Sequence, residues 1–233
     1  MDVQSIRQRV DAVRESIRLA CERVGRDRSE VTLVAVTKTF PPEIVSAGYD
    51  AGLRDFGENK AQEFADKFDA VGTAPGRDLR WHFIGHLQRN KIKLVAGRAR
   101  MIHGVDSLRL ARALQNFAER DDTAFTCLIQ VNVSGEASKF GLEPGSLRDF
   151  LAEARAFDRI RFRGLMTLAS PTSDVDRLRY EFRLLKQYLS DGRNTIDTLV
   201  YLSMGMSSDF EIAVEEGATH VRIGSALFGE RDL

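Results

Sequence analysis

The segment VTLVAVTK, residues 31–38, decides how the rest of the chain is interpreted. It is a short β-branched run without polar alternation, as expected for a strand of a parallel sheet that is buried on both faces. An amphipathic helical pattern precedes it, with apolar residues at steps of three and four from Val3 to Val24 and Gly25 as the predicted stop. A helix followed by such a strand indicates an α/β protein.

The same kind of run recurs along the chain, usually followed by a polar turn, an amphipathic helix and a glycine. The eight predicted strands are residues 31–38, 54–59, 80–86, 101–107, 126–133, 160–168, 198–205 and 220–228. Eight units in about 200 residues fit a single (β/α)8 TIM barrel better than a doubly wound sheet, which usually has fewer strands. We expect the extra N-terminal helix to plug or flank the bottom of this barrel.

Composition narrows the class of protein. Lys plus Arg and Asp plus Glu both number 34, so a net charge of zero offers no field for attracting nucleic acid. No run approaches the ~20 apolar residues that cross a bilayer, and two cysteines fit a reducing, cytoplasmic setting. Because no linker or low-complexity tract interrupts the pattern, we expect one domain over residues 1–233 that acts on a small molecule.

Lys38 is the first candidate for chemistry, because reactive groups in such barrels lie at the carboxyl ends of the strands. It ends the first predicted strand and shares parity with Val34 and Val36, so it is expected to point into the mouth of the barrel if those valines fill the interior. Partial burial lowers the pKa of a lysine and frees a nucleophilic amine. A lone lysine at a strand end is nevertheless more often simply solvated.

The last two strand ends predict a phosphate site opposite this lysine. Ser208 and Glu211 have the spacing of a capping box, which would open a helix after the seventh strand. The eighth strand leads into Gly224 and Ser225, where a backbone can approach a ligand closely and a hydroxyl can bind it. Loops after the seventh and eighth strands are the usual phosphate site of this fold.

Arg222 shares parity with Gly224 and is expected to point inward at the same level. A buried arginine needs an acceptor, for which the sequence leaves two choices open. One is a pyridine nitrogen of a ligand, and the other is a neighbouring carboxylate such as Glu58.

A pair of histidines and a basic run are interpreted as structural features and not as ligand-binding sites. His82 and His86 are four residues apart, but they lie in a strand-like segment without a third ligand, so no metal site is predicted. His82 is expected to line the barrel. A basic run between Arg89 and Arg100 lacks the aromatic side chains of a nucleic-acid surface and is interpreted as a solvated helix face.

Several long motifs then resemble the YggS/PROSC family of pyridoxal-phosphate-binding proteins, which have the barrel of alanine-racemase-like enzymes (PLP fold type III). The resemblance covers nearly the whole chain. Its motifs are LVAVTKTF around Lys38, FGENKAQE (56–63), WHFIGHLQRNK (81–91), VDS (105–107), QVNVSGEASKFGL (130–142), GLMTL (164–168), LSMGMSSDFE (202–211) and VRIGSALFGER (221–231).

The resemblance implies pyridoxal 5'-phosphate (PLP) as the cofactor, held as a Schiff base on Lys38, with Arg222 facing its pyridine nitrogen. The residues that it implies for the phosphate loops are Ser203, Gly205, Ser207, Gly224 and Ser225, and those that it implies beside the ring are Asn59, His82 and Met166. Phe40 departs from the family, which often has a second lysine at this position.

The resemblance also implies a role in vitamin B6 homeostasis as a carrier of PLP with little or no turnover. Related racemases use a second base, a tyrosine from an additional domain, whereas the four tyrosines here fall in predicted helices or in the seventh strand. The fixed charge of Arg222 would also weaken the cofactor as an electron sink. We expect a cytoplasmic monomer that delivers PLP to PLP-dependent apoenzymes; the alternative is a one-base amino-acid racemase.

Overall fold

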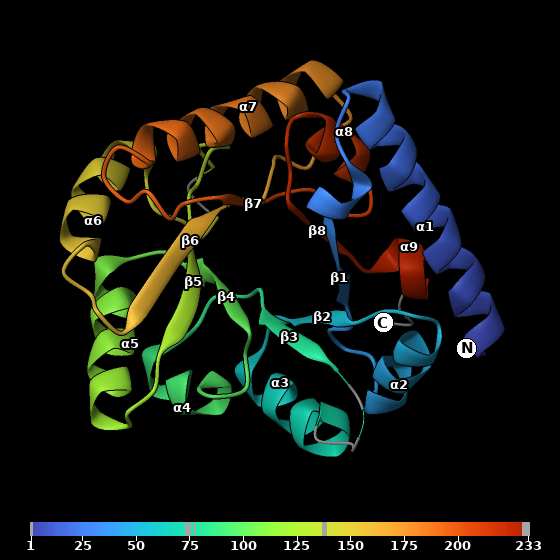
Figure 1. Cartoon of the computed structure of the whole chain (residues 1–233), viewed down its shortest axis with the longest axis horizontal. Coiled ribbons are helices and arrows are strands. Elements are labelled where there is room, and N and C mark those ends of the chain that lie inside the picture. Colours follow the sequence, from blue (N-terminus) through green and yellow to red (C-terminus); the bar gives the residue numbers. More distant parts are fainter. Residues whose placement is uncertain (1, 73–75, 77, 137–138, 230–233) are drawn as a thin grey trace.

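Eight parallel strands close into a barrel in a computed structural model that describes residues 2–72, 76, 78–136 and 139–229. The strands pair in chain order, and β8 pairs with β1 to close the sheet (Figure 1). Their bounds are β1 Thr32–Val36, β2 Asp55–Glu58, β3 Arg80–Phe83, β4 Met101–Val105, β5 Phe125–Gln130, β6 Ile160–Met166, β7 Tyr201–Ser203 and β8 His220–Ile223. The predicted (β/α)8 barrel is confirmed. The motifs at 130–142 and 221–231 extend partly outside the described residues.

The strands are shorter than predicted, chiefly at their carboxyl ends. β1 ends at Val36, so the prediction that Lys38 ends the strand was wrong: Lys38 lies in the turn that follows. β8 ends at Ile223, and the apolar residues after it form the short helix α9, Ser225–Phe228, whose Leu227 and Phe228 are buried. An apolar run that continues into a buried loop has the same composition as a strand, which is why the predicted ends were too long.

Helices surround the barrel on its outer side (Figure 1). Their bounds are α1 Val3–Arg23, α2 Pro42–Asp50, α3 Ala61–Lys67, α4 Ile92–Val95, α5 Leu108–Arg120, α6 Leu147–Ala154, α7 Val175–Gly192, α8 Phe210–Glu215 and α9, with short 3-10 turns at Arg28–Glu30, Arg89–Lys91 and Pro144–Ser146 and a π turn at Phe68–Gly72. The extra N-terminal helix α1 packs against α2, α8 and α9. It therefore covers the side of the barrel where the ring of strands closes, and it does not plug the bottom.

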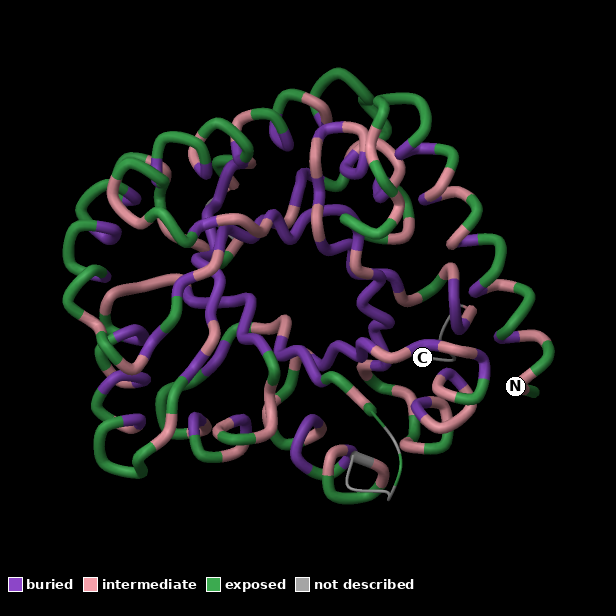
Figure 2. The backbone as a smooth tube through the Cα atoms, in the orientation of Figure 1, coloured by how far each residue is buried: buried purple, intermediate pink, exposed green. Residues whose placement is uncertain are grey.

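The core has two parts, which follow from the alternation of side chains along the strands. Leu33 and Ala35 belong to the large cluster shared with the helices, so Val34 and Val36 face the barrel interior. A small interior cluster contains Met101, Leu128 and Met166. Figure 2 shows buried residues along the strands and exposed residues on the outward sides of the helices.

One glycine of β6 is required by close packing of the barrel wall. A Cβ on Gly164 would lie 1.9 Å from the carbonyl oxygen of Tyr201 in β7, so any side chain would push the two strands apart. Among the described residues, no helix has the length and apolar character that crossing a membrane requires.

Candidate functional site

The turn that carries Lys38 is held in place from both sides. Before it, the carbonyl oxygen of Thr37 accepts a hydrogen bond from Nζ of Lys67 at 2.6 Å, and the Thr37 hydroxyl donates to Oε1 of Glu58 at 2.7 Å. After it, the backbone N–H of Thr39 donates to Oε1 of Glu63. Thr39 has a φ of 70°, a left-handed conformation that is strained for a β-branched residue. These hydrogen bonds hold the strained turn in one conformation. They therefore fix the backbone position from which the half-buried side chain of Lys38 extends.

Lys67 is the centre of this support. Its Nζ also lies 2.7 Å from Oε1 of both Glu58 and Glu63, and its side chain is only 4% exposed. Burial raises the pKa of Glu58, although hydrogen bonds from Lys67 and Thr37 oppose the shift. A buried ion pair of this kind is weak as a source of stability but strongly destabilising when one partner is lost.

The end of β2 leaves two buried oxygen atoms without donors. Oε2 of Glu58 and Oδ1 of Asn59 accept no hydrogen bond within the described residues. An unsatisfied buried acceptor costs roughly 1–3 kcal/mol, so such atoms in a native protein call for a ligand or a water molecule. Asn59, predicted as a ring neighbour, thus has an acceptor ready for a donor that the described chain does not supply.

The loops after β7 and β8 meet at one hydroxyl. Oγ of Ser207 accepts long hydrogen bonds from the backbone N–H groups of Gly224, at 3.3 Å, and of Ala226, at 3.4 Å. Backbone donors that converge on one point are the usual means by which loops bind a phosphate. Ser225 lies between the two donors and is exposed, so its hydroxyl is accessible beside them.

Gly205 permits the first of these loops to form. Its φ is 91°, and a Cβ on it would lie 2.6 Å from Cβ of Ala213. The predicted capping box of Ser208 and Glu211 was wrong: α8 begins at Phe210, Asp209 is its N-cap, and Glu211 pairs with Arg23 of α1. The side chain of Asp209 instead accepts a hydrogen bond from the N–H of Met206, which tightens the loop.

Arg222 is buried inside the barrel and only 4% exposed. Its Nη1 donates to Oγ of Ser203 at 2.6 Å, and its Nη2 donates to the carbonyl oxygen of Thr167 at 2.7 Å. Burial lowers the pKa of Arg222 to about 10, and the charge of Asp209 opposes this shift. The alternative of an ion pair with Glu58 was wrong, since Glu58 is bonded to Lys67 and Thr37.

Ser203 and His82 lie beneath the mouth of the barrel in a buried polar chain. Oγ of Ser203 is 2.8 Å from Nδ1 of His103, and Nε2 of His103 is 2.9 Å from Nδ1 of His82. Nε2 of His82 is 3.0 Å from Oδ1 of Asp55, which Arg80 binds through two nitrogens. Met166 is fully buried nearby in the interior cluster. His103 was not among the predicted site residues, and its only signal in the sequence was its parity in the fourth strand.

His86 lies at the mouth on the loop after β3. Its Nδ1 is 2.7 Å from Oδ2 of Asp106, which follows β4, and its ring stacks on Phe140 with centroids 4.2 Å apart. His82 and His86 therefore have separate partners. The described residues contain no group of three or more His, Cys, Asp or Glu side chains able to hold a metal ion.

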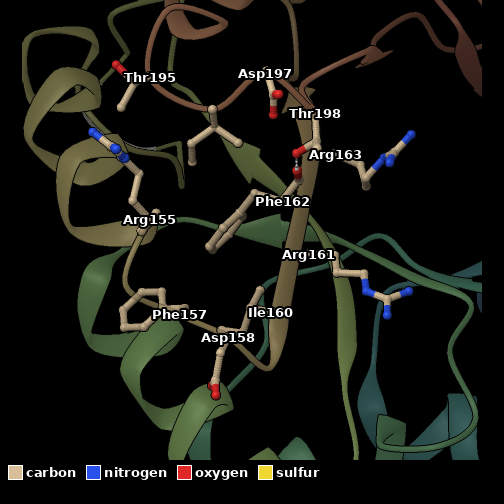
Figure 3. Close-up of a pocket in the computed structure, with 12 residues that line it drawn as sticks. Arg155, Phe157, Asp158, Ile160, Arg161, Phe162, Arg163, Thr195, Asp197 and Thr198 are labelled. Atoms are coloured by element: carbon tan, nitrogen blue, oxygen red, sulfur yellow. Dashed lines mark hydrogen bonds between the residues drawn. The ribbon is translucent and has the colours of Figure 1, made fainter.

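A cavity of about 590 Å³ lies elsewhere, at the amino end of β6. Arg161 and Arg163 of β6 line it together with Arg155 and the segment 195–198 (Figure 3). None of the ten predicted site residues, all of which the structure describes, lines this cavity. The predicted site is instead the carboxyl end of the barrel.

Comparison with known proteins agrees with this geometry. Residues 9–232 match the family described as alanine racemase, N-terminal domain. A relative from Aquifex aeolicus called pyridoxal phosphate homeostasis protein is 41% identical over 225 residues, which are 96% of this chain and 97% of that protein. The chain belongs to the pyridoxal phosphate homeostasis family.

Other members of this family align over the same length. A pyridoxal phosphate homeostasis protein from Pseudomonas aeruginosa is 41% identical over 99% of this chain and 97% of its own. PipY of Synechococcus elongatus, solved with PLP bound, is 32% identical, covers 96% of this chain and 100% of its own, and has a TM-score of 0.84. The predicted resemblance is confirmed.

Proposed function

We propose that this chain binds PLP as a Schiff base on Lys38 and serves as a carrier or buffer of the cofactor, with little or no turnover. The family's name and the PLP that PipY binds support this proposal. When bound, PLP would supply an aldehyde that condenses with an amine and a ring that withdraws electrons.

One observation carries the proposal: the Lys38 turn and the loop of Gly224 are neighbours. β1 and β8 pair side by side, with Val34 opposite Arg222. A Cβ on Gly224 would lie 3.3 Å from the carbonyl oxygen of Val36, two residues before Lys38. An aldehyde at Lys38 and a phosphate at the N–H groups of Gly224 and Ala226 would thus be close enough to belong to one small ligand.

The other residues of the site fit the same ligand. Gly205, Ser207 and Ser225 would hold the phosphate, and the unpaired Oδ1 of Asn59 would accept a hydrogen bond from the cofactor. Arg222 would face the ring nitrogen, and His82 and Met166 would lie beneath the ring. Ser203, predicted as a residue of the phosphate loops, is buried in the barrel interior and would act by holding Arg222.

Two features support low turnover. A guanidinium beside the ring nitrogen keeps that nitrogen unprotonated and limits electron withdrawal. All four tyrosines are described, and they lie in α2, α7 and β7 and not on loops after strands: Tyr49, Tyr180, Tyr188 and Tyr201. None of these four tyrosines is placed to act as the second base of a racemase.

The pair of His86 and Asp106 favours a second candidate, an amino-acid racemase that uses Lys38 as one base. A carboxylate on Nδ1 leaves Nε2 of the imidazole as a proton acceptor, and this pair lies at the same end of the barrel as Lys38. Incubating the PLP-loaded protein with L-alanine or L-serine and assaying the D-enantiomer separates the two functions. Turnover that Lys38→Ala or His86→Gln abolishes would favour the racemase.

The central experiment tests the bond to Lys38. Protein purified with PLP should absorb as a Schiff base, and borohydride followed by peptide mass spectrometry should place the reduced adduct on Lys38. Lys38→Ala should lose the adduct, whereas Lys60→Ala, which changes an exposed lysine, should keep it. An adduct on any other lysine, or none, contradicts the proposal.

Delivery to other proteins needs its own measurement. We propose that the chain acts as a cytoplasmic monomer that passes PLP to PLP-dependent apoenzymes. Mixing loaded protein with such an apoenzyme should activate it faster than the rate at which PLP dissociates into solution. If activation is no faster than the dissociation of PLP into solution, direct transfer is excluded and the protein acts as a buffer of PLP.

A further inference from the structure

A continuous line of hydrogen bonds crosses the interior of the barrel. It runs from Arg222 through Ser203, His103 and His82 to Asp55, and its four links measure 2.6, 2.8, 2.9 and 3.0 Å. The five side chains come from five different strands, and each residue is at most 8% exposed. We call these five residues the polar column.

The two ends of the polar column differ in what they can do. A guanidinium has only donors, so Arg222 must donate to Ser203. At the far end, burial favours protonation of Asp55, but hydrogen bonds from His82 and Arg80 outweigh it and hold the pKa of Asp55 below its usual value. An ionised carboxylate only accepts, so His82 must donate to it from Nε2.

Because Arg222 can only donate and Asp55 can only accept, they determine which atom donates in each hydrogen bond between them. With Nε2 of a neutral His82 protonated, Nδ1 of His82 accepts, and Nε2 of His103 must carry the proton that it donates. Nδ1 of His103 then accepts from the hydroxyl of Ser203, whose oxygen in turn accepts from Arg222. Each imidazole nitrogen then makes one hydrogen bond, the Ser203 hydroxyl donates one and accepts one, and both histidines are neutral. Burial, with the nearby charge of Arg222, lowers the pKa of His103 well below its usual value, as this order requires.

Two other arrangements are possible, in which either His82 or His103 is an imidazolium that donates from both nitrogens. In both of them Ser203 would accept from Arg222 and from His103. Each adds a buried positive charge to an interior that already contains Arg222, and each leaves the Ser203 proton without an acceptor among the contacts of the described residues.

We propose that Ser203, His103 and His82 are positioning residues for Arg222, held in a single proton order that joins its guanidinium to the carboxylate of Asp55. The link to the cofactor rests on the proposed function, in which Arg222 faces the pyridine ring. Within the described residues no carboxylate bonds to Arg222 directly. The polar column therefore orients one nitrogen of the guanidinium through Ser203, and the carbonyl oxygen of Thr167 fixes another. Asp55 itself is paired with Arg80, and the charge that opposes the burial of Arg222 is that of Asp209.

The barrel contains a matched control beside the polar column. The ring of His220 lies 6.1 Å from that of His82 and 5.8 Å from that of His103, at the same depth. Its Nδ1 is bonded to the neighbouring Thr219 hydroxyl and not to a member of the polar column. A change at His220 perturbs the same interior without breaking the chain.

The first test needs neither cofactor nor mutation. Long-range ¹H–¹⁵N spectra of histidine in the cofactor-free protein should show His82 and His103 as neutral Nε2–H tautomers at neutral pH, with peaks assigned by His82→Gln and His103→Gln. An Nδ1–H tautomer at either residue, or double protonation of either residue, overturns the proposal. Because PLP is absent, this result is independent of the proposed function.

The second test measures the effect on bound PLP. Ser203→Ala leaves Nη1 of Arg222 and Nδ1 of His103 unpaired, and it should weaken PLP binding roughly tenfold and shift the absorption band of the bound cofactor. Ser203→Thr, which keeps the hydroxyl, should restore the band, and His220→Gln should leave it unchanged. An unshifted band and unchanged affinity in folded Ser203→Ala overturns the positioning role. Failure of the unmutated protein to bind PLP would refute the proposed function instead.

Discussion

Nζ of Lys67 lies 2.6 Å from the carbonyl oxygen of Thr37, the residue directly before Lys38. The helix α3, which follows β2, thus holds the turn after β1. The buried ammonium group of Lys67 fixes the backbone directly before Lys38, the residue that is proposed to bind PLP. Neither Lys67 nor its partner Glu58 belongs to the predicted site.

Lys67→Met should destabilise the protein by about 3–5 kcal/mol, because Glu58 would be left as a buried charge without its partner. Urea unfolding of the cofactor-free protein measures this. Lys67→Met combined with Glu58→Gln should recover part of the loss, since no charge is then stranded. PLP affinity should fall in the single variant because the Lys38 turn loses one of its supports; equal stability of the two variants would contradict this account.

Gly205→Ala should both destabilise the fold and weaken PLP binding. The left-handed φ of 91° costs an alanine roughly 1 kcal/mol, and the Cβ would collide with Ala213 at 2.6 Å. Gly25→Ala is the matched control, because Gly25 is also left-handed, at 67°, but has no atom within 4 Å of its Cβ position. Thermal unfolding and PLP titration of both variants separate the conformational strain, which they share, from the collision, which only Gly205 has.

The fold could be predicted because each strand is a local apolar run. The segment 31–38 shows both the strength and the limit of that signal: its strand was found, but the predicted segment extends two residues past Val36, over Thr37 and Lys38, into the turn. The alternation of Leu33 and Ala35 with Val34 and Val36 was enough to assign the two faces.

The support of the site could not be predicted, because its contacts join residues that are far apart in the chain. His103 is 21 residues from His82 and 100 residues from Ser203, and nothing near it in the sequence distinguishes it from a histidine that fills space. Likewise Glu58 was weighed as a partner of Arg222, and only the barrel geometry assigns it to Lys67. Strand-end motifs identified the candidate ligand-binding residues, whereas closure of the barrel decides which buried groups hold them.

The buried histidines predict how stability depends on pH. Burial, opposed only by Asp55, lowers the pKa of His220 to about 3, and that of His103 is also well below its usual 6.5. Below about pH 6.5 the unfolded chain therefore binds protons that the folded protein does not. As the pH decreases, the free energy of unfolding falls by about 1.4 kcal/mol per pH unit for each histidine. The raised pKa of Glu58 has the opposite sign, since its protonation favours the folded state as pH falls.

Urea unfolding at about pH 7, 6 and 5 measures this dependence. The slope of the free energy of unfolding against pH gives the number of protons bound on unfolding. This number should decrease by about one in His220→Gln, and by about one more in the double variant with His103→Gln. Asp55 contributes in the same direction as the histidines, but only near and below its usual value of 3.8, outside this range. A slope that neither substitution changes would mean that these imidazoles take up protons in the folded protein.

Ser207→Ala tests the meeting point of the two loops after β7 and β8. Its Oγ accepts from the N–H groups of Gly224 and Ala226 at 3.3 and 3.4 Å, and these bonds are long enough that their loss should lower the stability of the cofactor-free protein by only about 0.5–1.5 kcal/mol. In the presence of PLP the effect should be larger, because the hydroxyl would then donate to an anionic phosphate, and charge-assisted hydrogen bonds are roughly twice as strong as neutral ones. PLP affinity should therefore fall about tenfold or more.

Ser208→Ala is the control for Ser207→Ala, since the adjacent Ser208 is exposed and does not form the predicted helix cap. Absorbance titrations with PLP and with pyridoxal, which lacks the phosphate, complete the design: Ser207→Ala should weaken binding of PLP and leave that of pyridoxal unchanged, and an equal loss for both ligands would show that the substitution acts on the fold and not on the phosphate.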